Sequence, residues 1–130
     1  MMAKRKTPRP TDTELEILRV LWRRGPSTVR EVHDELASSH PAGYTTVLKL
    51  MQIMHEKGLV SRDAAARAHV YEAAAAREET QRQLLGELLE RAFDGSPTKL
   101  VMQVLSDRRA SAEELEQIRA ALDELEGEER

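Results

Sequence analysis

The chain of 130 residues contains no cysteine. This absence excludes disulfide bonds, thiolate metal sites and cysteine nucleophiles together. Its apolar runs are a few residues long, whereas about 20 are needed to span a bilayer, so no direct membrane insertion is expected. The first residues are basic but lead into no apolar stretch of the kind that a secretory signal has. We therefore expect a cytoplasmic protein.

Aromatic side chains are also scarce. The chain has four of them, Trp22, Tyr44, Tyr71 and Phe93. This is too few for the stacking platforms of proteins that bind unpaired RNA or DNA.

Little in the sequence favours an enzyme. The four histidines, His33, His40, His55 and His69, have no metal-ligand spacing. There is no Gly-rich phosphate loop. The nearest approach to a catalytic cluster is His33 beside Asp34 and Glu35, but neighbouring residues of a helix point in different directions. We expect no catalytic residue, no metal and no cofactor.

Charge is distributed unevenly along the chain. The net charge of -3 combines a value of +3 for residues 1–72, from 12 Lys/Arg and 9 Asp/Glu, with -6 for residues 73–130, from 8 and 14. A basic half is typical of a part that meets a polyanion.

The basic half has the pattern of three short helices. Residues 1–10 form a basic arm that we expect to be disordered. Capping boxes, in which a Thr and a Glu three residues later bind each other's backbone amides, open helices at Thr11 and at Thr28. Gly25-Pro26 ends the first helix, and the second is expected to end near Ser38. The third helix is predicted over residues 44–57, with Val47, Leu50, Met51 and Met54 on its apolar side.

A β-hairpin is predicted next. Residues 59–63 and 69–73 are short and alternating, and 64–68 have the length of a hairpin loop. Three helices followed by a hairpin is the order of a winged helix-turn-helix. We therefore predict a mainly α fold, with a winged-helix DNA-binding domain over residues 11–75.

The acidic half reads as helix from about residue 77. Gly95 closes one helix, Ser96-Pro97 opens the next, and a third capping box, Ser111 with Glu114, opens the last. These helices supply too little mass for an independent core. We therefore predict that residues 76–130 form a helical dimerisation region, through the apolar residues Leu88, Leu89, Phe93, Leu100, Val104, Leu115, Ile118, Leu122 and Leu125. The alternative is that these helices fold back on their own chain.

A winged helix-turn-helix reads the major groove of double-stranded DNA with the first turns of its third helix. These turns offer Tyr44, Thr45, Thr46 and Lys49. The start of the second helix, at Thr28, is predicted to bind a phosphate oxygen through free amides. The hairpin residues Arg62, Arg67 and His69 are predicted to follow the neighbouring backbone or minor groove. A solvated helix face remains the alternative for Thr45 and Lys49.

Several motifs follow one another in a distinctive order. They are Thr11-Asp12-Thr13-Glu14-Leu15-Glu16-Ile17-Leu18, Leu21-Trp22, Val29-Arg30-Glu31-Val32, Tyr44-Thr45-Thr46-Val47, Glu56-Lys57-Gly58-Leu59-Val60 and Ala68-His69-Val70-Tyr71. This ordered set resembles the penicillinase-repressor family of bacterial winged-helix regulators, which includes repressors of β-lactamase and methicillin resistance. The resemblance extends from Thr11 to Leu125.

The resemblance implies a homodimeric repressor that binds operators with dyad symmetry. It also implies a pathway in which a membrane-bound zinc metallopeptidase sensor leads to cleavage of the repressor in its C-terminal region. The family's cut lies between an Asn and a Phe, and the matching pair here is Gln103-Val104. Where staphylococcal members have Ser-Pro-Lys-Thr at the start of the reading helix, this chain has Gly43-Tyr44-Thr45-Thr46, so we expect a different operator sequence.

A second class of function also fits the fold. Winged helices serve in addition as protein-interaction adaptors that never touch DNA. Such adaptors do not need the basic arm, or Lys49 and Arg67 on one side, and these cations favour the DNA-binding hypothesis.

Overall fold

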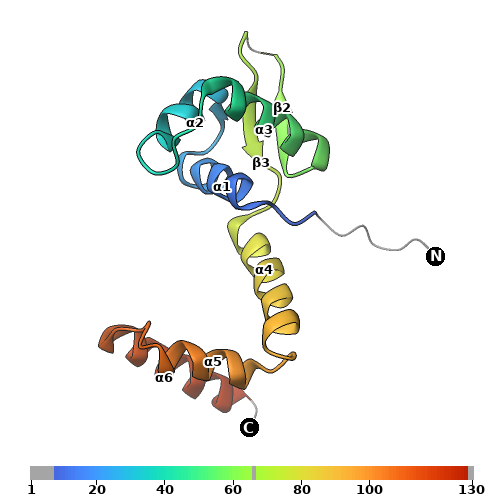
Figure 1. Cartoon of the computed structure of the whole chain (residues 1–130). Coiled ribbons are helices and arrows are strands. Elements are labelled where there is room, and N and C mark those ends of the chain that lie inside the picture. Colours follow the sequence, from blue (N-terminus) through green and yellow to red (C-terminus); the bar gives the residue numbers. More distant parts are fainter. Residues whose placement is uncertain (1–7, 66, 129–130) are drawn as a thin grey trace, which may run out of the picture. The chain divides into compact units, whose positions relative to one another are not determined.

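The computed structural model describes residues 8–65 and 67–128. The chain divides into two compact units, Met1–Leu84 and Leu85–Arg130. The elements, labelled in Figure 1, are α1 (Asp12–Arg24), β1 (Ser27–Thr28), α2 (Val29–Leu36), α3 (Tyr44–Lys57), β2 (Val60–Asp63), β3 (Val70–Ala73), α4 (Arg77–Ala92), α5 (Pro97–Ser106) and α6 (Ala112–Glu128). The predicted mainly α fold with a small β-hairpin is confirmed. Residues 1–7 of the basic arm lie outside the described residues, and Pro10 at its end is buried.

Local capping sets the helix boundaries. Thr11 Oγ1 accepts a hydrogen bond from the Glu14 amide at 3.2 Å, and the Glu14 carboxylate accepts one from the Thr11 amide at 2.9 Å. The other two predicted boxes, at the starts of α2 and α6, are formed in the same way. Helix α3 ends at Gly58, whose φ of +82° favours glycine because it has no Cβ. Helix α2 ends at Leu36, two residues before the predicted end.

The sheet has one strand more than the sequence predicted. Strands β2 and β3 form the expected antiparallel hairpin, and β1 pairs with the other edge of β3, giving the order β1-β3-β2. In this register Tyr71 lies between Ser27 on β1 and Arg62 on β2. Strand β1 has two residues, which is too short to show the alternation by which strands are recognised.

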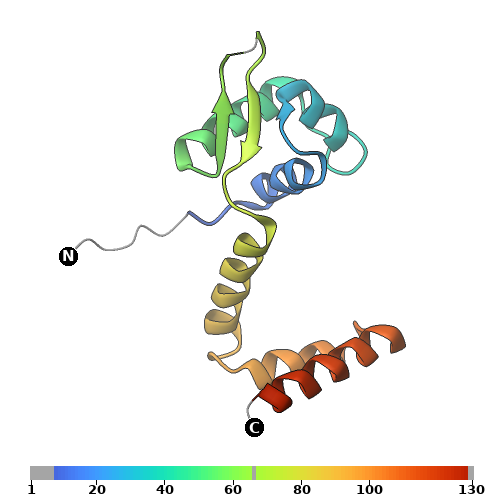
Figure 2. The same cartoon turned by 180° about the vertical axis from the view of Figure 1, so that it is seen from behind.

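The core of the first unit lies between the three helices and the sheet. Figure 2 shows the hairpin in front of helix α3. The buried apolar side chains come from every element of this fold: Ile17, Leu18, Val20, Leu21, Val29, Val32, Leu36, Val47, Met51, Met54, Leu59, Val60 and Tyr71. Trp22 is only partly buried and packs against the core. Its indole N–H donates to the Ala75 carbonyl at 2.9 Å, beyond the end of β3.

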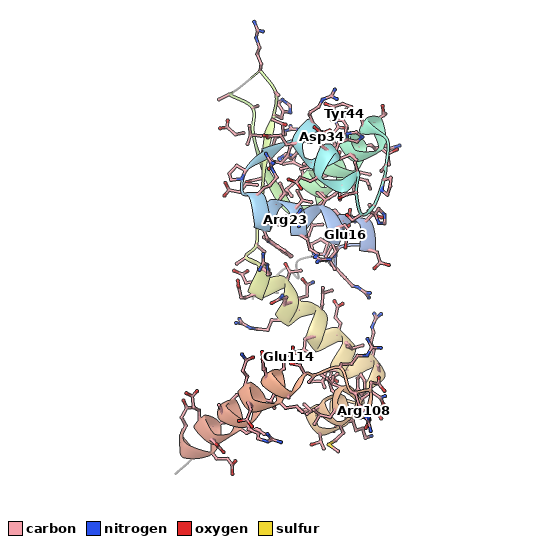
Figure 3. All side chains as sticks on the ribbon, turned by 90° about the vertical axis from the view of Figure 1, so that its left-hand side faces the viewer. Glu16, Arg23, Asp34, Tyr44, Arg108 and Glu114 are labelled. Atoms are coloured by element: carbon pink, nitrogen blue, oxygen red, sulfur yellow. The ribbon has the colours of Figure 1, made fainter. Side chains whose placement is uncertain are left out.

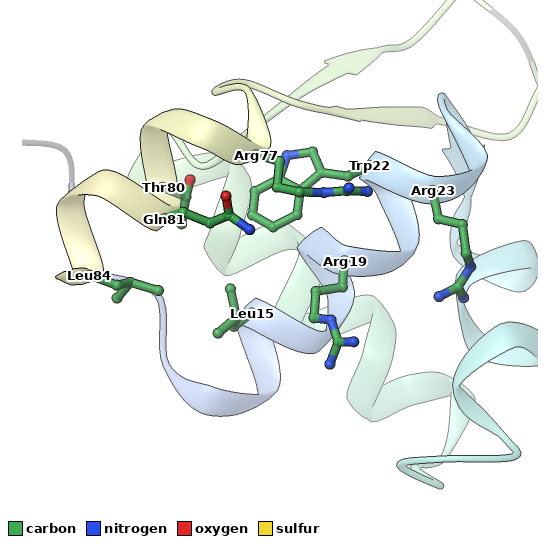
Figure 4. A pocket seen from close by; sticks show the side chains of 8 residues that line it. All are labelled: Leu15, Arg19, Trp22, Arg23, Arg77, Thr80, Gln81 and Leu84. Carbon is green, nitrogen blue, oxygen red and sulfur yellow. The ribbon is translucent and has the colours of Figure 1, made fainter. Parts of the chain in front are cut away.

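The first turns of α4 belong to the first unit. Thr80 on α4 is buried, and a hollow of about 410 Å³ lies between this part of α4 and α1. Figure 4 shows the side chains of Trp22 and Gln81 facing each other across it, while Arg19 and Arg23 point away from Trp22. The boundary between the two units therefore falls inside α4.

The second unit has little core of its own. No residue of α5 or α6 in the described ranges is buried. Its exposed large apolar side chains are Leu85, Leu88, Val101, Met102, Val104, Ile118, Leu122 and Leu125. Across residues 8–65 and 67–128, the helices are all too short or too polar to cross a membrane.

Candidate nucleic-acid interface

Helix α3 turns its first residues to solvent. Tyr44, Thr45, Thr46 and Lys49 are all exposed. On the opposite side Val47, Met51 and Met54 are fully buried, so the core fixes the rotation of the helix about its axis. Leu50, predicted on the same apolar side, is half-buried. The helix begins after Gly43 without a side-chain cap, and its first amides are therefore not used by a capping side chain.

Helix α2 holds the start of α3 through Tyr44. The Arg30 Cζ lies 4.8 Å from the centre of the Tyr44 ring, over its face. The His33 ring meets the same ring edge-on, with 6.0 Å between centroids and 71° between planes. In Figure 3, Tyr44 lies near Asp34, the residue that follows His33 on α2. A cation on an aromatic face is held without being neutralised, so this contact places a positive charge beside the exposed turns of α3.

Some of the backbone amides at the start of α2 are already hydrogen-bonded within its own capping box. The Thr28 amide donates to the Glu31 carboxylate at 2.9 Å, and the Glu31 amide donates to Thr28 Oγ1 at 3.2 Å. The amides that remain without an intrahelical partner are those of Val29 and Arg30. The predicted phosphate contact at Thr28 stays a prediction, and the backbone of Thr28 also pairs with Val70 of β3 in the sheet.

The carboxylate of Glu31 stays ionised and paired. The hydrogen bond from the Thr28 amide lowers the pKa of Glu31, and Arg24, 2.8 Å from the carboxylate, lowers it further. Because Arg24 compensates this negative charge, the start of α2 does not repel an approaching anion as an unpaired glutamate would.

The hairpin reaches the same surface. Arg62 lies on β2, and Arg67 and His69 lie before β3, all three exposed. One hollow of about 400 Å³ is lined by residues of α2, α3 and the hairpin: Thr28, Val29, Arg30, Tyr44, Leu48, Arg67, Ala68, His69 and Tyr71. Of the predicted DNA-binding residues, it brings together Thr28, Tyr44, Arg67 and His69. The other four, Thr45, Thr46, Lys49 and Arg62, do not line it.

Cations on this surface are left uncompensated. Four cations form no ion pair with any residue in the described part of the chain: Arg30, Lys49, Arg62 and Arg67. By contrast, three arginines of α1, Arg19, Arg23 and Arg24, are paired with glutamates. Free positive charge on one face is the electrostatic property that duplex DNA binding requires.

Arg30 and Tyr71 line this hollow and were not among the predicted DNA-binding residues. Arg30 follows Thr28 by two positions, and its place in the first turn of a helix predicted to meet phosphate was a usable signal. Tyr71 is buried in the core, and nothing in the strand pattern distinguishes it from any other inward-facing residue.

The histidines do not gather with other candidate ligands. His33 Nδ1 lies 3.3 Å from Asp34 Oδ1, at the protein surface. Over the ranges that the structure describes, no group of three or more His, Asp or Glu residues could hold a metal ion.

A three-helix unit with a hairpin wing and an exposed, cationic start of its third helix defines the class of winged-helix transcription regulators. Within that class, the model of the penicillinase repressor family matches residues 10–124, and the chain belongs to this family. It is a family of transcriptional repressors and not of enzymes.

Individual relatives agree with this assignment. The chain is 34% identical over 122 residues to the transcriptional regulator BlaI of Mycobacterium tuberculosis, covering 93% of this chain and 88% of the relative. It is 23% identical over 120 residues to the penicillinase repressor of Bacillus licheniformis, covering 92% and 94%.

Two solved structures share the fold of the first unit. One is the solution structure of the DNA-binding domain of the repressor BlaI, with a TM-score of 0.51 and 24% identity, over 58% of this chain and 93% of that one. The other is the monomeric form of Bacillus licheniformis BlaI in complex with the blaP half-operator, with a TM-score of 0.50 and 24% identity, over 57% and 90%.

Proposed function

We propose that two copies of this chain bind a dyad-symmetric operator in double-stranded DNA and repress transcription in the cytoplasm. The observation that carries the proposal is the set of cations on α2, α3 and the hairpin that have no ion-pair partner in the described residues, together with the exposed first turns of α3. Membership of the repressor family, and a fold shared with a BlaI structure solved on a half-operator, support it.

In this proposal α3 enters the major groove. Thr45 and Thr46 reach base edges or a thymine methyl, and Lys49 reaches guanine or a phosphate. Arg62, Arg67 and His69 follow the adjacent backbone or minor groove. The two buried methionines of α3 keep this polar face outward, so little rearrangement is needed on binding.

Dimerisation is proposed for the second unit. Leu88, Val104, Ile118, Leu122 and Leu125 are between 36% and 59% exposed within one chain. The other predicted contacts, Leu89, Phe93, Leu100 and Leu115, are half-buried. Exposed apolar side chains on consecutive helices favour a partner surface, and a second copy supplies a matching one. Two reading helices held by one dimer then bind two half-sites together.

Release of the operator is proposed to follow cleavage in this same region. Gln103 and Val104 are both exposed and lie in the middle of α5. A peptidase acts on an extended segment, so α5 must unwind locally before the bond is cut. A signalling pathway that includes a membrane metallopeptidase is the proposed source of the cleavage.

Footprinting of the purified chain on the DNA upstream of its own gene tests this proposal. We expect a protected site with two-fold symmetry. Affinity should fall steeply with salt, with a logarithmic slope of about -0.9 per phosphate contacted. A binding constant independent of salt, or no protection at low salt, would instead favour the protein-interaction adaptor.

A further inference from the structure

The residues of α3 that lie farthest from the core form one row along the helix, here called the outer stripe. They recur at spacings of four, three and four residues and all are exposed: Thr45, Lys49, Gln52 and Glu56. The fully buried side chains of α3 lie on the opposite side of the helix, so the core fixes the outer stripe toward solvent. Thr45 and Lys49 have a role in the proposed function, whereas Gln52 has none so far.

The side-chain amide of Gln52 makes no hydrogen bond with the residues that the structure describes. This amide carries two N–H donors and one carbonyl acceptor. It has no net charge, so it adds nothing to the sequence-independent attraction between the protein and the DNA backbone. Gln52 therefore offers a donor and an acceptor, side by side, to a partner outside the chain.

Gln52 is within reach of the same groove as Thr45 and Lys49. An α-helix rises about 1.5 Å per residue, so Gln52 lies about 10 Å from Thr45 along the helix axis, and about 4.5 Å from Lys49. Successive bases are about 3.4 Å apart, so the outer stripe from Thr45 to Gln52 spans about three base steps. A homeodomain helix reads the major groove with residues at positions i, i+3, i+4 and i+7. Gln52 is the i+7 residue when Thr45 is taken as i.

We propose that Gln52 reads an adenine in each operator half-site. Its amide N–H donates a hydrogen bond to adenine N7, and its carbonyl oxygen accepts one from the N6 amino group. This inference rests on the proposed function and deepens it, because it names a base and the residue that recognises it. Lys49 supplies a charge that any phosphate attracts, whereas Gln52 supplies discrimination between bases.

Glu56 limits the outer stripe at its far end. Its carboxylate forms no ion pair within residues 8–65 and 67–128, and the neighbouring cation, Lys57, is engaged by Glu14. The DNA backbone repels such an uncompensated negative charge. We therefore place the end of the base contact at Gln52, one turn before Glu56.

A base-pair scan of the footprinted half-site tests the proposal. Each position is changed in turn, and each duplex is titrated with the wild type and with Gln52→Ala by fluorescence anisotropy. In the wild type, replacement of one A·T pair should lower the affinity by about tenfold. In Gln52→Ala the same replacement should change the affinity by less than about twofold, while the losses at the other positions remain. An affinity lost equally on all duplexes, or not lost at all, would overturn the assignment.

Folding does not confuse this result. Gln52 is exposed, and alanine is a better helix former than glutamine, so the unfolding midpoint of Gln52→Ala should equal or exceed that of the wild type. Failure of the wild-type chain to bind any duplex is a different outcome, because it would remove the proposed function itself.

Removal of one adenine atom makes the test sharper. 7-Deazaadenine lacks the N7 acceptor but still pairs with thymine. At the proposed position it should weaken binding of the wild type and add nothing to the effect of Gln52→Ala. Losses that simply add would show that Gln52 and N7 do not meet, and would contradict the proposal.

Two further variants fix the assignment to Gln52. In Gln52→Glu the side chain only accepts hydrogen bonds, so the preferred base at this position should change from adenine to cytosine, whose N4 amino group donates. A retained preference for adenine would contradict the proposed pairing. Glu56→Gln is the matched control on the outer stripe: it should strengthen binding to all duplexes alike and keep the adenine preference. Loss of that preference in Glu56→Gln would overturn the assignment to Gln52.

Discussion

The ammonium group of Lys57 lies 2.9 Å from both carboxylate oxygens of Glu14. The side chain of Glu14 is 2% exposed and that of Lys57 is 33% exposed. The same carboxylate accepts the Thr11 amide in the capping box of α1. One buried acid therefore joins the start of α1 to the last turn of α3, and so helps to hold helix α3 in place.

Removal of the lysine should destabilise the first unit. Lys57→Met leaves the Glu14 carboxylate buried with its capping bond alone, and we expect a loss of about 2–3 kcal/mol in the free energy of unfolding. This value is below that of a fully buried pair because Lys57 is partly exposed. Urea denaturation measures it. Lys99→Met is the control, since the Lys99–Asp94 pair is exposed and should contribute about 0–0.5 kcal/mol. Equal losses in the two variants would contradict a special role for Glu14.

The free energy of unfolding should depend on pH through the titration of the Glu14 carboxyl group. Burial alone would raise the pKa of this carboxyl, but the Thr11 amide and Lys57 outweigh burial, and the pKa lies below its ordinary value of 4.5. Because the folded pKa is depressed, the stabilisation is fully present above the unfolded pKa and is lost as the pH falls through the folded one.

The measurement is the urea midpoint between pH 7 and pH 3, for the wild type and for Glu14→Gln. The pKa values of Glu31 and Glu114 are also lowered, chiefly by the backbone amides of Thr28 and Ser111, so both proteins should lose stability in acid. We expect the wild-type curve to fall more steeply below about pH 4.5. Parallel curves would show that Glu14 is not the residue responsible.

The sequence predicted those parts of the fold that local chemistry determines. The Thr-x-x-Glu boxes specify helix starts through bonds between residues three apart, and Gly58 supplies a backbone conformation that other residues avoid. Lys49 could be assigned to the polar face of α3 because Val47, Met51 and Met54 recur with helical spacing. These signals lie within one turn of the residues they determine.

Contacts between residues that are far apart in the sequence could not be predicted from such local signals. Strand β1 exists because β3 offers it a free edge, and its two residues carry no pattern of their own. The contact of Arg30 with Tyr44 joins two helices and depends on the turn between them. The pairing of Lys57 with Glu14 spans 43 residues. Each of these required the packed structure.

Lys49 should contribute to DNA affinity directly. Lys49→Ala removes an exposed cation from the reading face of α3, and we expect operator binding to weaken by about 1–3 kcal/mol if the lysine reads a base. Fluorescence anisotropy with the footprinted duplex measures this. Arg82→Ala is the control, because it removes an exposed cation from α4. Full affinity in Lys49→Ala would exclude Lys49 from the contact with DNA.

The exposed leucines of α6 should control the assembly state. Leu122 is 53% exposed within one chain, so Leu122→Asp should leave the chain folded. In a dimer, a buried unpaired carboxylate on each chain should raise the dissociation constant by at least about 100-fold. Ala120→Asp is the control, since residues two apart on a helix point to nearly opposite sides. Sedimentation equilibrium should show monomers for Leu122→Asp and dimers for Ala120→Asp. A Leu122→Asp chain that remains dimeric would place the partner surface away from this face of α6.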